Sequence, residues 1–529
     1  MSVSAGSASW ALRLSDQTTT EHLAAVLARE ARPGDVITLS GDLGAGKTTF
    51  ARAFVRAFVG DAALDVPSPT FTLMQSYECP RGTVVHADLY RIHDAVELEE
   101  LGWDEAVDNA VVLVEWPERA GDSLGESRID INLRLVPGFD GERIAVLSGH
   151  GAHVRRLADL KALRTVIDRA GWGSAERAPI YGDASSRLYE RLTRPGGETA
   201  ILMIAPARPK VQASRSEKPY HIVARLSDSV HAFVAVDRGL RALGLSAPVI
   251  YGQDLDAGLL LVEDLGGEGV VDAHGPIPDR YAEAVQVLVK LHTSPVPGTL
   301  PVVEGVEHTL LPYDVEALSI EVGLLLEWYL PHRAGRFVPN SGRADFARIW
   351  DGLLSQVSGD PDDHPRNGAP GEQPSFSPTW VLRDFHSPNL IWLKDRAGPA
   401  RIGLIDFQDA VMGHPAYDLA SLLQDARVSV PAELELRLLA LYARERRARD
   451  PAFDVEAFTR AYAILGAQRA TKLFGLFVRL DRRDGKPAYL AHLPRIGAYL
   501  LRNLEHPALH ELRAWYETHI PQLAAGTPG

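Results

Sequence analysis

Short apolar runs alternate with helix-length amphipathic segments over the first 150 residues. A pattern typical of a capping box at Thr18 and Glu21 predicts a helix that continues to about Glu30. The apolar runs predict strands at Trp10–Leu14, Val36–Leu39, Val84–Ala87 and Val111–Val114, and a second helix spans Thr48–Val59. Alternation of this kind predicts an α/β domain whose sheet is mostly parallel and has helices on both faces.

A different pattern follows two closing strands at Ile129–Leu135 and Arg143–Leu147. Residues 151–156 are predicted to form a linker after a first domain at 1–150. A helix then precedes strands near Ser186–Thr193 and Thr199–Ile204, and the chain is mostly helical from Pro278 onward. We therefore expect a bilobal α+β protein-kinase-like phosphotransferase domain at 157–529, with a small lobe to about residue 266 and a helical large lobe after it.

Length and charge restrict the classes of protein that fit. A chain of 529 residues is expected to hold two or more domains. Cys79 is the only cysteine, and no apolar stretch approaches the ~18 residues of a membrane span, so we expect a cytoplasmic location. The net charge is −14, of which −11 falls in residues 1–150. An acidic domain binds the phosphate backbone poorly, so tRNA is expected to be only an indirect partner.

The segment that follows the second apolar run matches G-x-x-x-x-G-K-[ST]. It lies between a predicted strand and a predicted helix, which is the context of a P-loop for ATP and Mg²⁺. Lys47 is predicted to contact the β- and γ-phosphates, and the Thr48 hydroxyl is predicted to ligate Mg²⁺. The nucleotide-binding residues predicted here are Gly41, Asp42, Leu43, Gly44, Ala45, Gly46, Lys47, Thr48 and Thr49.

Two later apolar runs each end in a carboxylate. Val111–Val114 is followed by Glu115, the Walker-B pattern, and Val84–Ala87 is followed by Asp88. At the ends of parallel strands these acids would meet the metal and the attacking water. One of them alone could instead cap the next helix.

These motifs together resemble the TsaE family, the ATPase subunits of bacterial tRNA threonylcarbamoyladenosine synthesis. The resemblance rests on the P-loop, Val66–Leu73, His86–Arg91 and Glu115–Pro117, and covers about the first 150 residues. It implies an ATPase that works with TsaB/TsaD-like transferase proteins, with Asp88 and Glu115 serving the metal and hydrolysis. Further family positions are Thr70 on a nucleotide-sensing loop and, with less defined roles, Tyr90, Arg91 and Trp116.

A second set of motifs predicts phosphotransfer in the C-terminal half. Leu382–Asn389 fits the kinase catalytic loop R-D-x-x-x-x-N, and Asp406 follows Asp384 by 22 residues, after an apolar strand. Asp384 is predicted to accept the proton of the attacking hydroxyl, while Asn389 and Asp406 ligate Mg²⁺. Asp418 is predicted to brace the lobe through backbone hydrogen bonds.

The remaining parts of an ATP site are less complete. Ser185, Ser186 and Arg187 lie in a turn between predicted strands that would cover the phosphates. Glu263 begins a predicted interlobe hinge whose backbone would bind adenine. The strand Thr199–Ile204 lacks the lysine of a usual kinase, and Lys210 is the nearest one.

The C-terminal half resembles the aminoglycoside/choline-phosphotransferase superfamily, and most closely its AmgK-type amino-sugar kinases. The resemblance covers roughly residues 155–529 and implies phosphorylation of the anomeric hydroxyl of N-acetylmuramate or N-acetylglucosamine in cell-wall recycling. It places Glu327 and Trp328 near the sugar, although Trp328 is equally compatible with core packing. Two alternatives stay open: a kinase for choline, an aminoglycoside or another small alcohol, and an N-terminal nucleotide-switched scaffold of negligible turnover.

Overall fold

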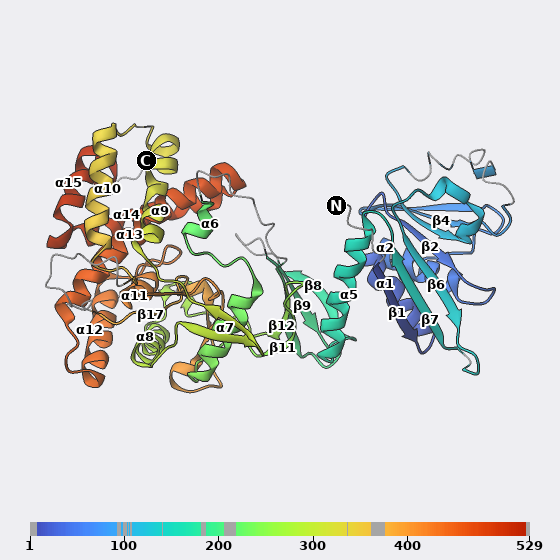
Figure 1. Ribbon diagram of the computed structural model, residues 1–529, viewed down its shortest axis with the longest axis horizontal. Coiled ribbons are helices and arrows are strands. Elements are labelled where there is room, and N and C mark those ends of the chain that lie inside the picture. Colours follow the sequence, from blue (N-terminus) through green and yellow to red (C-terminus); the bar gives the residue numbers. More distant parts are fainter. Residues whose placement is uncertain are drawn as a thin grey trace. The chain divides into compact units, whose positions relative to one another are not determined.

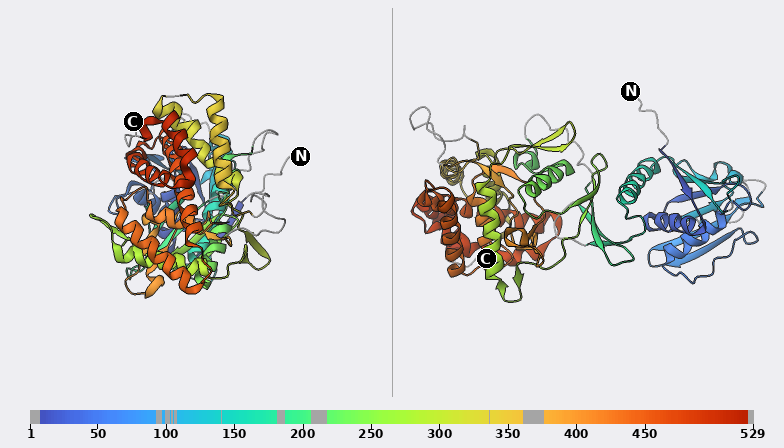
Figure 2. Two further views of the ribbon diagram at one scale, coloured as in Figure 1. Left: turned by 90° about the vertical axis from the view of Figure 1, so that its left-hand side faces the viewer. Right: turned by 90° about the horizontal axis from the view of Figure 1, so that it is seen from below.

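The structure is a computed structural model and describes residues 8–92, 97–98, 103, 105, 108–139, 141–180, 187–205, 218–335, 337–360 and 376–524. The chain divides into two compact units, Met1–Asp168 and Arg169–Gly529. Their elements can be followed in Figures 1 and 2. Within the described residues, no helix is both long and apolar enough to cross a bilayer.

The first unit is built around a seven-stranded sheet of order β1-β7-β6-β2-β5-β4-β3. Its four central strands run parallel, whereas β1, β7 and β3 are paired antiparallel at the two edges. The elements are β1 Ala8–Leu14, α1 Gln17–Glu30, β2 Val36–Ser40, α2 Lys47–Val59, β3 Met74–Cys79, β4 Gly82–Asp88, β5 Val111–Glu115, β6 Ile129–Leu135, β7 Arg143–Gly149 and α5 His153–Arg169.

The sheet of the first unit is covered on both faces. Neighbouring residues of one strand point to opposite faces, so Val111 and Leu113 enter one core cluster while Val112 and Val114 enter another. Helices α1 and α2 pack together and supply the first of these clusters (Figure 1). The predicted α/β domain with a mostly parallel sheet is thus observed, and the described helices α1, α2 and α5 all contribute to the first of these clusters.

Two local predictions for this unit need correction. Helix α1 is capped by Asp16, whose side chain accepts from the Thr19 amide, and not by the pair Thr18 and Glu21. The predicted linker at 151–156 runs into α5, whose residues up to Asp168 belong to the first unit. Leu157 and Leu160 of α5 are buried in the core of that unit, which explains why the compact unit ends later than residue 150.

The second unit begins with a small lobe whose five-stranded antiparallel sheet has the order β11-β12-β10-β9-β8. The predicted strands Ser186–Thr193 and Thr199–Ile204 are present as β9 and β10. The strand expected before the turn at Ser185 had no predicted bounds and corresponds to β8, while β11 was not predicted. The elements are β8 Glu176–Ile180, β9 Leu188–Thr193, β10 Thr199–Ile204, α6 Tyr220–Val223, α7 Val230–Ala242, β11 Ile250–Asp254 and β12 Leu259–Glu263.

The rest of the second unit is mostly helical, as predicted, and is coloured from yellow-green to red in Figure 2. Two short antiparallel strand pairs flank the catalytic motifs. The elements are β13 Val271–Asp272, β14 Gly275–Pro276, α8 Pro278–Thr293, β15 Thr299–Val303, β16 Val306–Thr309, α9 Val315–Leu324, a π-helix Leu325–Ala334, α10 Asn340–Leu354, β17 Thr379–Val381, β18 Leu390–Trp392, β19 Ile402–Leu404, β20 Val411–Gly413, α11 Ala416–Leu423, α12 Ala432–Arg449, α13 Val455–Asp484, α14 Leu493–Leu504, α15 His510–His519 and α16 Pro521–Ala524.

Candidate active sites

The glycine-rich segment of the first unit forms a tight loop between β2 and α2. Gly41 has a φ of 135°, and a Cβ atom there would lie 2.2 Å from the carbonyl oxygen of Leu133. Gly46 has a φ of 102° and caps α2 at its N-terminus. Both positions therefore require glycine, and the loop can turn its N–H groups toward an anion at the start of a helix.

Lys47 is buried beside this loop. Its ammonium group donates to the carbonyl oxygens of Gly41 at 2.7 Å and Asp42 at 3.0 Å, and lies 3.7 Å from the centre of the Trp116 ring. Burial lowers the pKa of Lys47, although the charge of Glu115 opposes this shift. The Lys47 ammonium group is thus bound by carbonyl oxygens of the P-loop. When a nucleotide binds, phosphate oxygens would replace these carbonyl groups as its partners.

The two predicted acids lie at the ends of neighbouring parallel strands. Asp88 of β4 is the register partner of Glu115 of β5. The Thr48 hydroxyl donates to Glu115 at 2.9 Å, and the Ser68 hydroxyl donates to Asp88 at 2.9 Å. A hydroxyl and two carboxylates form an oxygen donor set of the kind that Mg²⁺ prefers, so the residues fit the predicted metal.

Sequence reasoning missed two side chains that support this site. His86 is buried, and its Nε2 atom lies 3.0 Å from Glu115. Because an ionised carboxylate only accepts, this hydrogen bond places the proton on Nε2. Arg143 of β7 lies 98 residues from Ala45 in the sequence, and it supports the P-loop by donating to the Ala45 carbonyl oxygen at 2.7 Å.

The other predicted residues of the first unit surround the loop. Asp42, Leu43 and Gly44 are exposed at its tip, and Thr49 and Thr70 are half-buried. The ring of Tyr90 lies 5.2 Å from that of Trp116, and the Arg91 guanidinium lies 4.3 Å from the ring of Phe71. Large apolar side chains of this region, Leu43, Phe71 and Tyr90, are exposed to solvent.

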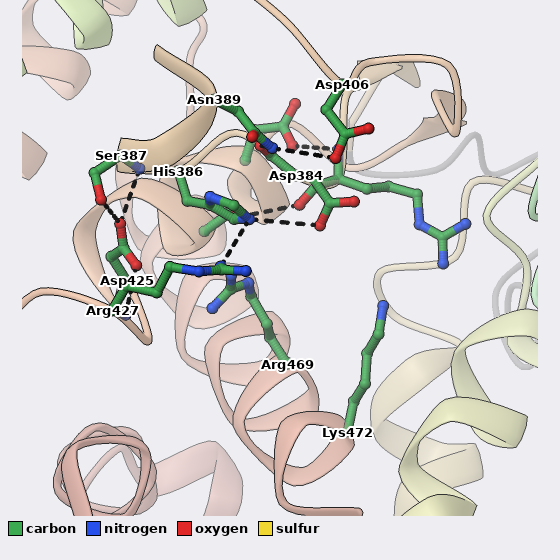
Figure 3. A network of polar contacts seen from close by, with 12 residues as sticks. Asp384, His386, Ser387, Asn389, Asp406, Asp425, Arg427, Arg469 and Lys472 are labelled. Carbon is green, nitrogen blue, oxygen red and sulfur yellow. Dashed lines mark hydrogen bonds and ion pairs between the residues drawn. The ribbon is translucent and has the colours of Figure 1, made fainter. Parts of the chain in front are cut away.

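In the second unit, one cavity of about 670 Å³ contains Asp384, Asn389 and Asp406. The amide nitrogen of Asn389 donates to the Asp384 carbonyl at 2.9 Å and lies 3.5 Å from an Asp406 carboxylate oxygen (Figure 3). The amide oxygen of Asn389 is thereby turned away from these acceptors. Asp406 has a φ of 59°, a left-handed conformation that is costly for a residue other than glycine and is concentrated at functional sites.

The surroundings of Asp384 and Asp406 shift the pKa values of the two carboxylates in opposite directions. Burial opposes the ionisation of Asp384, but its electrostatic interactions with His386 first, and then with Lys472, Arg383 and Arg469, outweigh burial and hold the Asp384 pKa below its usual value. Burial and the nearby charge of Asp384 raise the pKa of Asp406. A cation placed between the two carboxylates would relieve this repulsion, which fits Mg²⁺ held by Asp406 and Asn389.

Among the described residues, no group of three or more His, Cys, Asp or Glu side chains could hold a metal ion alone. This agrees with the small donor sets at both sites, because Mg²⁺ in nucleotide sites takes most of its ligands from phosphates and water.

A buried network fixes the catalytic loop. The amides of Leu382 and Arg383 donate to the two oxygens of Asp418 at 2.6 and 2.9 Å, which confirms the predicted bracing role of Asp418. The Arg383 guanidinium donates at 2.5 Å to Glu321, which also pairs with Lys472 at 2.7 Å. Glu321 and Lys472 were not identified from the sequence, because they reach the loop from α9 and α13.

The nucleotide end of the cavity has apolar walls that include Ile201, Met203 and Ile405. Glu263 lines it at the predicted hinge, and its side chain is held by Arg396 at 3.0 Å. Arg187 lies 3.4 Å from Asp406, close to where phosphates would lie. Ser185, Ser186 and Lys210 fall outside the described residues.

Glu327 and Trp328 do not line this cavity. Both are in the π-helix, where Glu327 is exposed and the Trp328 ring lies 5.7 Å from that of His332. Their role in sugar binding stays a prediction. His386, Arg427 and Tyr489 line the cavity on the side of Asp384, and sequence reasoning missed them. We call this part of the cavity the acceptor end, because Asp384 is the predicted proton acceptor.

Comparisons with known proteins match a different family to each of the two structural units. A family model for threonylcarbamoyl adenosine biosynthesis protein TsaE matches residues 14–138, and one for the phosphotransferase enzyme family matches residues 176–452. The TsaE protein of Rickettsia felis is 39% identical over 125 residues, which are 24% of this chain and 72% of that protein.

The N-acetylmuramate/N-acetylglucosamine kinase of Caulobacter vibrioides is 37% identical over 363 residues, which are 66% of this chain and 94% of that protein. The solved structure of the aminoglycoside phosphotransferase APH(2'')-Ib with ADP aligns with 61% of this chain and 91% of its own at 13% identity, with a TM-score of 0.37. The chain thus belongs to two families joined in one polypeptide: TsaE in its N-terminal part and the phosphotransferase enzyme family in its C-terminal part.

Proposed function

We propose that the C-terminal unit phosphorylates the anomeric hydroxyl of N-acetylmuramate and N-acetylglucosamine with ATP, in cell-wall recycling. The observation that carries the proposal is the shared cavity of Asp384, Asn389 and Asp406. Asp384 would orient and deprotonate the hydroxyl, since nearby cations keep it ionised. The names of the relatives supply the sugar.

Arg187 is proposed to take the place of the missing strand lysine. It lines the nucleotide cavity and pairs with Asp406, which would ligate the metal between the phosphates. A guanidinium can bind two phosphate oxygens at once, so it is chemically suited to clamp the α- and β-phosphates. Asn389 and Asp406 would hold Mg²⁺, which neutralises charge on the transferred phosphoryl group when it is bound.

For the N-terminal unit we propose an ATPase that supports threonylcarbamoyladenosine modification of tRNA. Lys47 and Thr48 would hold ATP and Mg²⁺, and Asp88 and Glu115 would serve the metal and the attacking water. The exposed side chains of Leu43, Phe71 and Tyr90 beside this site would contact TsaB/TsaD-like proteins. The net charge of −11 in residues 1–150 disfavours direct tRNA binding.

A substrate screen tests the kinase assignment. The full chain is incubated with ATP and Mg²⁺ together with either amino sugar, choline or an aminoglycoside, and phosphorylated products are identified by ³¹P NMR. We expect sugar 1-phosphates only. Arg427 at the acceptor end disfavours a cationic substrate, so dominant turnover of choline or an aminoglycoside would contradict the proposal.

The ATPase assignment is tested by comparing ATP hydrolysis with and without the transferase proteins, in the absence of sugar. Stimulation by those proteins that depends on Glu115 supports the proposal. Unchanged, negligible hydrolysis together with nucleotide-dependent binding would favour the scaffold alternative.

A further inference from the structure

One cation at the acceptor end of the kinase cavity differs from the others. Three arginines line the cavity. Arg187 pairs with Asp406 at 3.4 Å, and Arg191 pairs with Asp264 at 2.7 Å. Arg427 has no carboxylate within ion-pair distance of its guanidinium among the residues that the structure describes.

The contacts of Arg427 orient its side chain without neutralising it. Its backbone amide donates to Asp425 at 2.8 Å, and Nη1 lies 3.3 Å from Nε2 of His386 (Figure 3). The guanidinium also lies 6.0 Å from the centre of the Tyr489 ring. An imidazole carries no negative charge, so this contact can accept a hydrogen bond from Arg427 without supplying a counter-charge.

Other nearby groups add to the positive charge. Arg469 of α13 also points toward His386 in Figure 3, and its positive charge, like that of Arg427, lowers the His386 pKa. The Arg469 guanidinium donates to the Gln424 carbonyl oxygen at 3.2 Å. Because this oxygen is neutral, the contact does not compensate the positive charge of Arg469. Asp425 is a nearby negative charge whose carboxylate accepts from the amide and the hydroxyl of Ser387 at 2.8 and 2.5 Å, and it forms no ion pair with Arg427 within the described part of the chain.

This positive site adjoins the predicted base. Nε2 of His386 lies 3.8 Å from Asp384 and 3.3 Å from Nη1 of Arg427, so Arg427 approaches the same imidazole nitrogen as the residue that would receive the anomeric proton. An acceptor whose anomeric hydroxyl contacts Asp384 would therefore place another part of its sugar ring near the guanidinium. A carboxylate on that part would meet Arg427 as a charge-assisted pair.

We propose that Arg427 binds the carboxylate of an acidic sugar and thereby sets the preference for N-acetylmuramate over N-acetylglucosamine. The inference rests on the proposed kinase function. The two sugars share the ring, the acetamido group and the anomeric hydroxyl, whereas only N-acetylmuramate carries a lactyl ether with a carboxylate. A residue that distinguishes them must act on that carboxylate, which a planar guanidinium binds through two hydrogen bonds.

The test compares kcat/KM for both sugars in the full chain and in Arg427→Gln. We expect the ratio of N-acetylmuramate to N-acetylglucosamine to fall by roughly 10- to 100-fold, the usual effect of a charged hydrogen bond. Arg427→Lys should restore part of the ratio. The control Arg348→Gln removes an exposed arginine that pairs with Glu511 at 3.0 Å, and should leave the ratio unchanged.

A change in the substrate gives an independent measurement. N-acetylmuramate whose carboxyl group is converted to the primary amide should be a poorer substrate for the wild type by a similar factor, while Arg427→Gln should treat the acid and the amide alike. If Arg427→Gln does not fold, as judged by thermal unfolding, the comparison of acid and amide in the wild type decides the question. Equal kcat/KM for acid and amide in the wild type would overturn the inference.

Two failures are distinguishable. If the wild type phosphorylates neither sugar, the proposed kinase function fails, and this inference fails with it. If the wild type phosphorylates both sugars and Arg427→Gln lowers both rates equally, the function stands and the inference fails, because Arg427 would then serve the phosphoryl group common to both reactions.

Discussion

The ammonium group of Lys47 donates to the carbonyl oxygen of Gly41 at 2.7 Å, so the cation is satisfied by the loop that precedes it. Burial lowers the pKa of Lys47, and the charge of Glu115 only partly offsets this effect, so an anion in place of the neutral carbonyl partners would stabilise the ammonium ion further. The position of Lys47 is therefore compatible with a role in phosphate binding.

We predict that Lys47→Ala abolishes ATP hydrolysis stimulated by the transferase proteins and spares sugar phosphorylation. The two units have separate sets of phosphate-binding residues, so loss of one cation should act on one site only. Hydrolysis and sugar 1-phosphate formation are measured on the same preparation. Lys161→Ala, a surface lysine of α5, is the control. Parallel loss of both activities in Lys47→Ala would show that the sites are coupled.

Local patterns predicted the central elements, and β6 Ile129–Leu135 and β10 Thr199–Ile204 have the predicted bounds. The strand β3 was missed and β8 was given no bounds, because both are edge strands with polar sequences, and β8 contains Pro179. An edge strand pairs on one side only and needs no continuous apolar run.

In the candidate sites, too, some residues could be predicted from the sequence and others could not. Contiguous motifs such as the P-loop and Leu382–Asn389 were recognisable because their spacing is set by local geometry. Arg143, Lys472 and Arg427 were not, because tertiary packing brings them to their sites from distant elements. No periodicity marks such residues, so only the fold reveals them.

The end of the first unit gives a second prediction. A fragment that ends at residue 168 should be more stable than one that ends at 150, because it keeps the buried side chains of Leu157 and Leu160. It also keeps the ion pair of Arg156 with Asp35 at 2.5 Å. Burial of two leucines contributes about 3–6 kcal/mol to the free energy of unfolding. Urea unfolding of both fragments measures the difference, and equal midpoints would contradict the assignment of α5 to this unit.

A third prediction separates the roles of the two kinase carboxylates. Asp384→Asn should lower sugar phosphorylation by about 10²- to 10⁴-fold, because it removes the proton acceptor, while Mg-ATP affinity is largely kept. Asp406→Asn should weaken Mg-ATP binding instead. Both variants keep side-chain size, so packing is nearly unchanged.

These measurements are made in a Lys47→Ala background, so that nucleotide binding reports the kinase site alone. Activity of Asp384→Asn within threefold of its parent would mean that another residue is the base. An equal loss of Mg-ATP affinity in both variants would remove the division of roles and leave the kinase assignment intact.

The last prediction concerns pH. Burial lowers the pKa of His386 from about 6.5 to about 4. Between about pH 4 and pH 6.5, His386 is therefore mostly neutral in the folded protein and mostly protonated in the unfolded chain. Between these values the unfolded state binds more protons, and the stability of the second unit should therefore fall as pH drops from 7 to 5. Each pKa unit corresponds to about 1.4 kcal/mol, so His386 should contribute a loss of roughly 2 kcal/mol by pH 5.

His386→Gln isolates this contribution. The glutamine oxygen can still accept from Arg427, whose Nη1 lies 3.3 Å from the imidazole nitrogen, but glutamine does not titrate. The variant should thus lose less stability than the wild type over the same pH interval. Urea midpoints of the C-terminal unit are measured at pH 7 and pH 5 by pulse proteolysis with detection of C-terminal peptides. Other histidines titrate in both proteins and cancel in the comparison. An identical pH dependence would mean that His386 is charged in the folded protein, and that it stabilises ionised Asp384 as a cation rather than presenting a neutral acceptor to Arg427.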